Sequence, residues 1–214
     1  ECMNMNEKGD MSMYINPKDL ETGNMYKMLI GTVTPRPIAF VTSQDEKGNV
    51  NAAPFAFFNV VCPEPPMLMI SVGKDNGELK DTSANILSTK EFVVHIVDED
   101  IVKDVVKTGD NYGADVNELN MTDLTTTDSK VVNVPSVKEA KVRYECELVH
   151  HLELGDEQKG TDMLVGQIKS IYIDDEIYDV DKAYVDVEKL NPITRVVGNH
   201  YVRIGEPVED LLDK

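Results

Sequence analysis

The sequence predicts a mostly β protein with a few helices, folded as one antiparallel β-barrel. Roughly six or seven short apolar and β-branched runs are separated by turn residues, whereas few stretches have helical periodicity. Residues 137–154 alternate apolar and polar side chains, and residues 163–173 return as a partner strand after a glycine-containing turn. Such a succession of strands favours an antiparallel barrel over a doubly wound parallel sheet.

Composition restricts the classes of protein to which the chain belongs. Its 214 residues are enough for one domain with a substantial core, and 41% hydrophobic with 28% charged residues is typical of a soluble globular protein. The 39 acidic against 21 basic residues give a net charge of −18, which argues against nucleic acid or an anionic membrane as a partner. The three cysteines form no CxxC pair, and no apolar run approaches the roughly 20 residues that span a bilayer. We therefore expect a cytoplasmic protein.

Three parts of the chain are distinguished by composition. Residues 1–13 are expected to be a disordered or non-native segment, because they are polar and methionine-rich without a clear period. Residues 14–205 hold all of the predicted elements and form the single domain. Residues 206–214 form an acidic C-terminal tail.

The first third of the domain begins with a helix and continues with strands. Asn16-Pro17 before the apolar positions and Gly31 after them predict a helix between these residues. Residues 38–43 and 50–58 read as two strands joined by the turn chemistry of residues 43–49.

A proline-rich connection follows this hairpin. Pro65 and Pro66 donate no hydrogen bond to a ladder, so the connection lies outside the sheet interior. The continuous apolar run of residues 67–72 then predicts a strand that is covered on both faces.

The middle of the chain predicts two short helices around a strand. Asp81 or Thr82 is expected to cap a helix that runs toward Ser88, and residues 91–97 form a buried strand. Residues 98–107 predict a second helix, with the chain from Gly109 to residue 130 as a surface loop containing about one helical turn.

The long strand of residues 137–154 is expected to be amphipathic. Its apolar face would carry Cys146 and Leu148, whereas Arg143 and Glu145 would lie on the polar face. The tail of residues 184–201 completes the domain.

Three segments carry a resemblance to a known family. They read PRPIAFVTS at residues 35–43, NAAPFAFFN at residues 51–59 and KDTSANI at residues 80–86. Their order and spacing resemble those of the flavin reductase-like proteins, also described as FMN-binding split barrels, and in particular the flavoredoxin-type members. The resemblance extends from about Tyr14 to about Gly205, nearly the whole chain.

This resemblance implies both a fold and an activity. The fold is an antiparallel split β-barrel that binds FMN non-covalently, and related proteins are homodimers with the flavin at the subunit boundary. The implied activity is that of an oxidoreductase passing electrons from NAD(P)H through the bound flavin to a small-molecule or protein acceptor. No residue stands out as a catalytic acid or base, because hydride transfer to a flavin does not require one.

The residues themselves predict a site for the phosphate of such a ligand. A phosphate is bound by free N–H groups at a helix start, by hydroxyls and by cations. Lys80, Asp81 and Thr82 lie at a predicted helix start, and Thr42 with Ser43 adds hydroxyls at a strand end. Arg36, between two prolines, is a second candidate cation.

A second set of residues predicts the surface for the flavin ring. Pro54 has no N–H and breaks the ladder, so that neighbouring backbone groups are free to face a ligand. In a regular strand Phe55 and Phe57 lie on one side with Ala56 opposite, and a bulge would redirect them. The family resemblance extends the candidate site to Asn51, Ala53, Pro54, Phe55, Ala56, Phe57, Ser71 and Asn85.

Each candidate also has a purely structural interpretation. Lys80 could be a solvated cation, Thr82 a plain helix cap, and Arg36 a member of a structural ion pair. Phe55 and Phe57 could be core residues. A metal site is not expected, because the sequence has no zinc-type cysteine spacing and no HExxH motif.

Departures from the family pattern leave two alternative functions open. Ala56 stands where relatives commonly have Ser, and His95 where Asn is common. Many flavin reductases carry a Gly-Asp-His turn that helps to seat the nicotinamide, whereas this chain reads Gly160-Thr161-Asp162-Met163. The first alternative is therefore a flavoredoxin-type electron carrier reduced by a protein partner. The second is a non-catalytic flavin-binding module.

Overall fold

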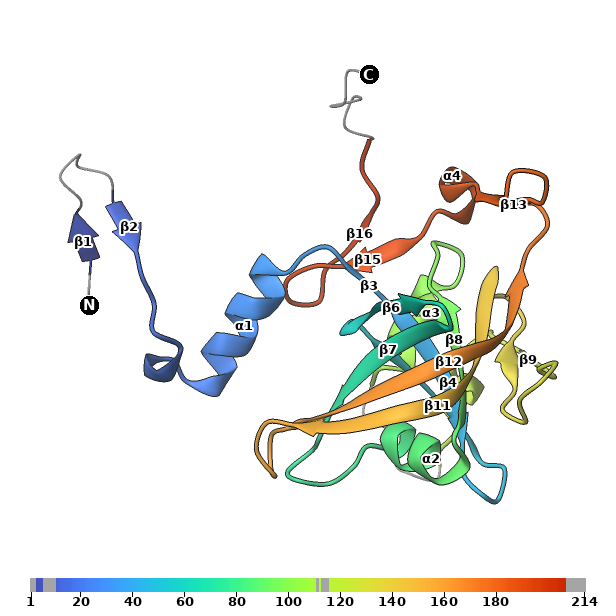
Figure 1. Ribbon diagram of the computed structural model, residues 1–214, viewed down its shortest axis with the longest axis horizontal. Coiled ribbons are helices and arrows are strands. Elements are labelled where there is room, and N and C mark those ends of the chain that lie inside the picture. The colour runs from blue at the N-terminus through green and yellow to red at the C-terminus, as the bar shows by residue number, and fades with distance from the viewer. Residues whose placement is uncertain (1–2, 6–10, 111, 113–115, 207–214) are drawn as a thin grey trace.

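The computed structural model describes residues 3–5, 11–110, 112 and 116–206 (Figure 1). Its centre is a seven-stranded antiparallel sheet in the order β5-β4-β8-β11-β12-β7-β6. The strands of this sheet are β4 (Ala39–Gln44), β5 (Val50–Phe55), β6 (Phe58–Pro63), β7 (Pro66–Gly73), β8 (Glu91–Ile96), β11 (Val142–Leu154) and β12 (Thr161–Ile173). The predicted antiparallel arrangement is confirmed, and the central sheet has seven strands, beside shorter strands that the sequence does not predict.

The order of strands shows that the sheet is a split barrel. Strands β5 and β6 occupy the two opposite edges of the sheet, yet only Ala56 and Phe57 separate them in the chain. A connection of two residues requires the sheet to curl until its edges meet. The two edge strands do not pair with each other, so the barrel stays open along this seam. Ala56 and Phe57, predicted to contact the flavin, lie at the seam.

The barrel interior is apolar and closely packed. The interior cluster includes Val41, Ile70, Phe92, Cys146 and Leu164. Phe40, the neighbour of Val41 on β4, points to the opposite face of the sheet and belongs to another cluster. Helix α2 (Asp81–Thr89) closes one end of the barrel and contributes Ile86 to the cluster. A side chain at Gly166 would place its Cβ 2.3 Å from the Phe92 ring, so glycine is required there for the ring to fit.

A second apolar cluster covers the outer face of β4 and β5. It contains Phe40 and Ala52 from the sheet and Val105 from α3 (Val102–Lys107). Further members come from η2 (Glu118–Met121) and from the small sheet of β9 (Thr126–Thr127) and β10 (Ser136–Val137). The sheet is therefore buried on both faces here, which is typical of its apolar sequence.

The prediction that β11 has one polar face is wrong for its first half. Arg143 and Glu145 are both buried. Glu145 accepts hydrogen bonds from the backbone N–H groups of Lys130, Val131 and Val132, and the Arg143 guanidinium lies 3.8 Å from the centre of the Tyr172 ring. The loop before β10 supplies the partners of Glu145 and β12 supplies the partner of Arg143, which a count of alternating residues in the strand cannot show.

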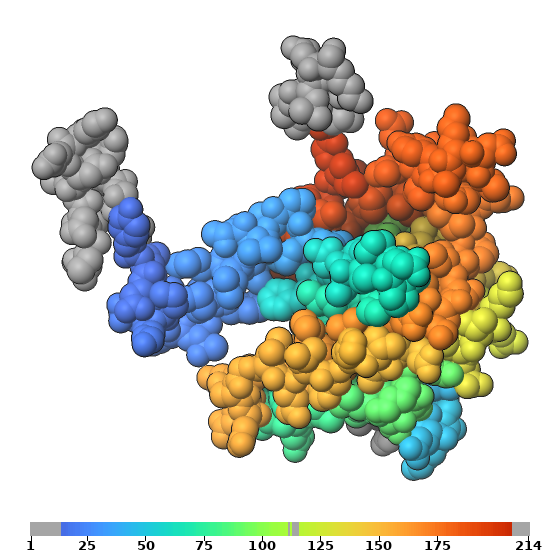
Figure 2. Space-filling model, in the orientation of Figure 1, coloured from blue at the N-terminus to red at the C-terminus, as the bar shows by residue number. Residues whose placement is uncertain are grey.

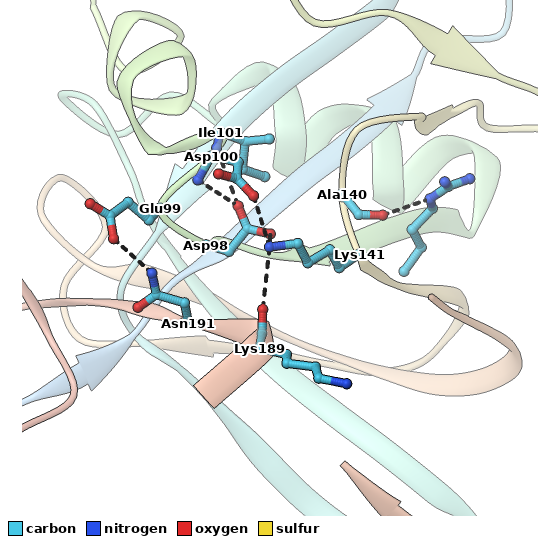
Figure 3. Close-up of polar contacts among 9 residues, drawn as sticks. Asp98, Glu99, Asp100, Ile101, Ala140, Lys141, Lys189 and Asn191 are labelled. Atoms are coloured by element: carbon cyan, nitrogen blue, oxygen red, sulfur yellow. Dashed lines mark hydrogen bonds and ion pairs between the residues drawn. The ribbon is translucent and has the colours of Figure 1, made fainter. Parts of the chain in front are cut away.

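The C-terminal part of the domain crosses the outside of the barrel. Its elements are β13 (Tyr178–Asp179), β14 (Tyr184–Val185), α4 (Val187–Leu190), β15 (Ile193–Arg195) and β16 (Tyr201–Arg203), with β15 also pairing with β3 (Arg36–Pro37). Figure 3 shows the polar contacts that fix this segment: Asn191 donates to Glu99, and Lys141, which also pairs with Asp98 and Asp100, donates to the Lys189 carbonyl. Asp98 is fully buried and accepts from the N–H groups of Asp100 and Ile101 at the start of α3.

The N-terminal segment stands apart from the barrel. The hairpin of β1 (Met3–Met5) and β2 (Met11–Met13) leads into η1 (Pro17–Asp19) and then α1 (Thr22–Thr32). The predicted helix is thus divided in two, and Gly31 lies inside α1 rather than after it. In Figure 2 the blue part of the chain that leads into α1 extends away from the globular body. The expectations for residues 1–2, 6–10 and 207–214 lie outside the described residues.

No helix within the described ranges is long and apolar enough to cross a membrane.

Candidate functional site

Helix α2 begins at the point where the sequence predicts a phosphate site. Lys80 occupies the N-cap position, and no side chain accepts a hydrogen bond from the first turn at that cap. The expected capping by Asp81 or Thr82 is therefore wrong. The Thr82 hydroxyl instead accepts a hydrogen bond of 2.9 Å from the Asn51 side chain. The N–H groups of the first turn thus have no capping acceptor from the N-cap side chain, and this end of the helix is electropositive.

Two cavities adjoin this helix start. The first, which we call the basic cavity, has a volume of about 370 Å³ and contains no acidic residue in its lining. It lies among α1, the end of β5, the β11–β12 turn and the β15–β16 loop, and is lined by Tyr26, Ile30, Arg36, Pro54, Phe55, Ala56, Phe57, Gly73, Lys80, Lys159, Gly160, Thr161, Arg195 and Gly198.

The second cavity is on the side of α3 and η2. This acidic cavity has a volume of about 320 Å³ and is lined by Asn51, Ala53, Pro54, Phe55, Asp75, Glu78, Leu79, Lys80, Asp81, Thr82, Thr108, Gly109, Asp110, Tyr112 and Glu118. Five of these residues are carboxylates and one is a lysine. A third hollow, of about 490 Å³, opens at the β4–β5 turn and is lined in part by Asn51, Asp81 and Asn85.

Pro54, Phe55 and Lys80 line both the basic and the acidic cavity. They form a common wall, with an apolar ring surface from Pro54 and Phe55 and a cation at its edge. The predicted ring surface and the predicted phosphate site are therefore adjacent.

Several of the predicted residues face these spaces and others do not. Asn51, Ala53, Pro54, Phe55, Ala56, Phe57, Lys80, Asp81, Thr82 and Arg36 line at least one of the two cavities. Thr42, Ser43 and Ser71 line neither cavity nor the third hollow, and Asn85 lines only the latter.

The residues outside the cavities have structural partners. The buried Thr42 hydroxyl donates to the Pro135 carbonyl at 2.7 Å, and the Asn85 side chain donates to the Ser43 hydroxyl at 3.3 Å. Ser43 and Asn85 thus join α2 to β4 behind the helix start. In the single chain, these hydroxyls support the site from behind rather than facing a ligand.

Arg36 combines a position in the lining with a structural function. Its guanidinium donates to the carbonyls of Ile30, Val33 and Val196 at 2.6, 2.5 and 3.1 Å. These contacts hold the end of α1 against the loop after β15. The Arg36 Nε is buried without a hydrogen-bond partner within the described part of the chain.

Glu118 is a site residue that sequence reasoning missed. It lies in η2, and its Oε2 accepts a hydrogen bond of 3.0 Å from the backbone N–H of Ala52 on β5. Burial raises the pKa of the Glu118 carboxyl, the hydrogen bond from Ala52 opposes this, and nearby Asp81 raises the pKa further. The isolated motif around Glu118 gives no indication that the loop folds back onto β5.

Tyr26, Lys159 and Arg195 of the basic cavity were also missed. They come from α1, the β11–β12 turn and β15, which lie far apart in the sequence. Nothing local in the sequence indicates Lys159 or Arg195 as site residues.

Groups of other types are absent or structural. Among the residues that the structure describes, no cluster of three or more potential ligands could hold a metal ion. His151 pairs with the buried Asp162 at 2.8 Å on β11 and β12. Neither residue lines the two cavities at the helix start.

The fold and the site together define a split barrel with a ligand-binding wall at the start of a helix. Comparison with known proteins identifies the family: residues 31–188 match the model of the flavin reductase like domain, and the chain belongs to this family. The predicted resemblance is confirmed.

Individual relatives extend over nearly the whole chain. The uncharacterized protein YwrF of Bacillus subtilis (strain 168) is 45% identical over 197 residues, covering 91% of this chain and 96% of the relative. The nitrilotriacetate monooxygenase component B of Bacillus cereus superposes with a TM-score of 0.90 at 38% identity, covering 94% of this chain and 99% of the other. The Pseudomonas fluorescens 2-nitrobenzoate 2-nitroreductase NbaA has a TM-score of 0.81 at 32% identity, with coverages of 94% and 99%.

Proposed function

We propose that this protein binds FMN non-covalently and transfers electrons from NAD(P)H through the flavin to a second acceptor. The observation that carries the proposal is the wall of Pro54, Phe55 and Lys80, which joins an apolar ring surface to the uncapped start of α2. Membership of the flavin reductase like domain family supports it, as does the similarity to proteins named as a monooxygenase component and a nitroreductase.

The residues at the wall fit the two ends of FMN. Ala53 and Phe55, beside the N–H-deficient Pro54, provide a surface for the ring, and Lys80 with the first-turn N–H groups of α2 provides a site for the phosphate. Glu118 and Asp81 lie in the same cavity and disfavour an anion beside them. The phosphate is therefore expected at the Lys80 edge of the cavity, away from these carboxylates.

A flavin, when bound, accepts and donates electrons in one- or two-electron steps. The protein's own residues bind and orient the cofactor. Lys80 holds negative charge at one end, and the Phe55 side of the wall excludes water from the ring surface. As in the sequence analysis, we assign no acid or base to the transfer itself.

We further propose that the working form is a homodimer with the flavin near the subunit boundary. In the single chain, α1 exposes Tyr26 (55%) and Leu29 (48%), its C-cap residue Val33 is exposed as well (61%), and Tyr26 also lines the basic cavity. An apolar helix face of this kind beside a ligand site is the type of surface that a second subunit covers. Size-exclusion chromatography with light scattering tests this expectation.

We propose a cytoplasmic location on independent grounds. Cys62 and Cys146 are both free thiols, and Cys146 is buried in the barrel interior. Free thiols without disulfides are typical of proteins in a reducing compartment.

The experiment that tests the function is an anaerobic titration of the purified protein. FMN should bind with a shifted visible spectrum, and NADH or NADPH should then bleach the flavin absorbance within seconds. A colourless protein that ignores added FMN would contradict the flavin proposal.

Bound FMN that no pyridine nucleotide reduces would instead favour an electron carrier reduced by a protein partner. The segment Gly160-Thr161-Asp162-Met163, which carries no histidine, is the observation in favour of that second candidate.

A further inference from the structure

The charges of the basic cavity are the reverse of those of the chain. The protein carries 39 acidic and 21 basic residues, so a random part of its surface is predominantly acidic. The basic cavity nevertheless has four cationic residues in its lining, Arg36, Lys80, Lys159 and Arg195, and no carboxylate. Like charges repel when they are brought together, and no carboxylate in the lining compensates these four cations. The cavity therefore has a positive potential that an anionic ligand would neutralise.

None of these four cations is neutralised by a neighbouring carboxylate. Elsewhere in the described residues, Lys74, Lys107 and Lys141 and several other cations form ion pairs with Asp or Glu, whereas none of the four does so. An acidic chain has many carboxylates available for pairing. Cations gathered without one at a cavity are the pattern of an anion-binding site.

The available donors favour an anion of low charge. The Arg36 guanidinium already donates to three carbonyls, and the Arg195 guanidinium donates to Tyr201, Gly198 and Asn199. Both arginines therefore contribute positive potential to the cavity but have few N–H groups free to bind a ligand. The ammonium groups of Lys80 and Lys159 have no bonded partner in the described residues. Because the proposed function assigns Lys80 to the flavin phosphate, Lys159 is the free donor left for a second anion, and one ammonium group matches one carboxylate.

The remaining lining favours a planar molecule. Tyr26, Phe55 and Phe57 bring three aromatic rings to the cavity, and the rings of Tyr26 and Phe57 lie 6.3 Å apart with a 44° tilt. Aromatic rings pack well against flat apolar ligands. The volume of about 370 Å³ is at the lower end of the range for small-molecule sites.

We infer that the basic cavity binds the flavin's small-molecule partner and that this partner is a planar aromatic acid with one carboxylate. The inference rests on the proposed function, because the common wall of Pro54 and Phe55 is what places such a molecule beside the flavin. Lys159 holds the carboxylate, Lys80 borders both ligands, and the rings of Tyr26 and Phe57 contact the aromatic part.

The test is calorimetric binding of benzoate and of its neutral isostere benzamide to the FMN-loaded protein. Benzoate should bind at least about fivefold more tightly than benzamide, and its affinity should fall between 50 and 500 mM salt because the contact is ionic. Lys159→Gln should weaken benzoate roughly three- to tenfold and leave benzamide unchanged. Lys182→Gln is the matched control, because Lys182 pairs with Asp179 in the β13–β14 hairpin beyond the opposite end of β12.

Three results would overturn the inference. Equal affinities for benzoate and benzamide would show that the cavity does not select anions. An equal effect of both lysine variants would show that benzoate does not bind at Lys159. If NADP⁺ displaces benzoate and loses more affinity than benzoate in Lys159→Gln, the cavity belongs to the nucleotide donor instead.

The same titration on protein without FMN separates this inference from the proposed function. Failure of FMN to bind would contradict the proposed function, and selective benzoate binding that depends on Lys159 would still identify an anion site. Protein that binds FMN normally but shows no benzoate selectivity would contradict only the further inference. Circular dichroism at matched concentrations confirms that the lysine variants are folded.

Discussion

The basic and the acidic cavity share one wall but differ in almost every other respect. On one side of Pro54 and Phe55, four cations from distant segments surround three aromatic rings. On the other side, five carboxylates surround the first turn of α2. The difference shows that the fold, and not the overall composition, determines where positive and negative side chains gather. The acidic cavity is built from segments between Asn51 and Glu118, whereas the basic one requires α1, the β11–β12 turn and the C-terminal hairpin to converge from a wider range of the chain.

Strands β4 and β8 support the wall of Pro54 and Phe55, and a change there should affect both cavities. Phe40 on β4 pairs in register with Pro54 on one side and with His95 on the other. The Val137 N–H donates to Nε2 of His95, so Nδ1 carries the proton and donates to the Phe40 carbonyl at 2.9 Å. Burial lowers the pKa of His95 to about 4, the bond to Phe40 opposes this, and Arg143 adds to the lowering.

Acid should therefore loosen both cavities together. Because the pKa of His95 falls from 6.5 to about 4 on folding, its contribution is complete above pH 6.5 and is lost as the pH falls toward 4. The expected loss in the free energy of unfolding is about 3 kcal/mol. Denaturant titrations at several pH values measure it, with His95→Gln as the comparison. A variant whose pH slope between 6.5 and 4 equals that of the wild type would contradict this role.

Lys80 lines both cavities, and its removal should weaken the binding of anions in the basic cavity as well as the binding of FMN. Lys80→Ala removes the charge at the start of α2, and we expect FMN to bind roughly 10- to 100-fold more weakly because a hydrogen bond to a charged group is lost. Quenching of flavin fluorescence on binding measures the dissociation constant. Lys182→Ala is the control for net charge. An unchanged dissociation constant in Lys80→Ala would move the phosphate away from this helix.

Glu118 sharpens the comparison from the acidic side. A carboxyl whose pKa is raised on folding lowers stability as the pH rises through its normal range, since the folded state disfavours the charge. Glu118→Gln keeps an acceptor for the Ala52 N–H and removes the charge. We expect a higher Tm than the wild type at pH 7, with the difference vanishing near pH 4, and FMN binding roughly two- to fourfold tighter. A lower Tm at pH 7 would show that the carboxylate itself is needed.

The barrel could be predicted from the sequence because its signals are local. The turn at residues 43–49, the prolines after β6 and the β11–β12 hairpin each follow from a few adjacent residues. The start of α2 was located correctly, although its cap is Lys80, because a helix start is also a local feature.

The charge of the cavities could not be predicted, because it depends on residues brought together only by the fold. Arg36 bonds to Val196, which lies 160 residues further along the chain, and this contact brings the β15–β16 loop to the cavity. Thr42 is predicted from the sequence as a phosphate contact, because hydroxyls bind phosphate and its segment matches the family. Its partner is the carbonyl of Pro135, 93 residues away.

The smallest expected effect comes from a substitution of Ala56, which lies at the seam between β5 and β6. The family resemblance implies Ser at this position, and Ala56 is half-buried in the lining of the basic cavity beside Phe55 and Phe57. Ala56→Ser adds one hydroxyl without altering charge or strand geometry. If the flavin ring extends along the seam, the new hydroxyl should tighten FMN binding about two- to fivefold, the contribution of one neutral hydrogen bond.

Fluorescence titration of Ala56→Ser alongside Ala56→Gly separates hydrogen bonding from size, because glycine changes the volume without adding a donor. Tighter binding in the serine variant alone would place the ring edge at the seam, on the basic side of the wall. Equal affinities in both variants would restrict the ring to the acidic side, where Ala53 and Asn51 are the nearest predicted contacts. The basic cavity would then be open along its whole length to the second ligand, and its benzoate affinity should be insensitive to the serine hydroxyl.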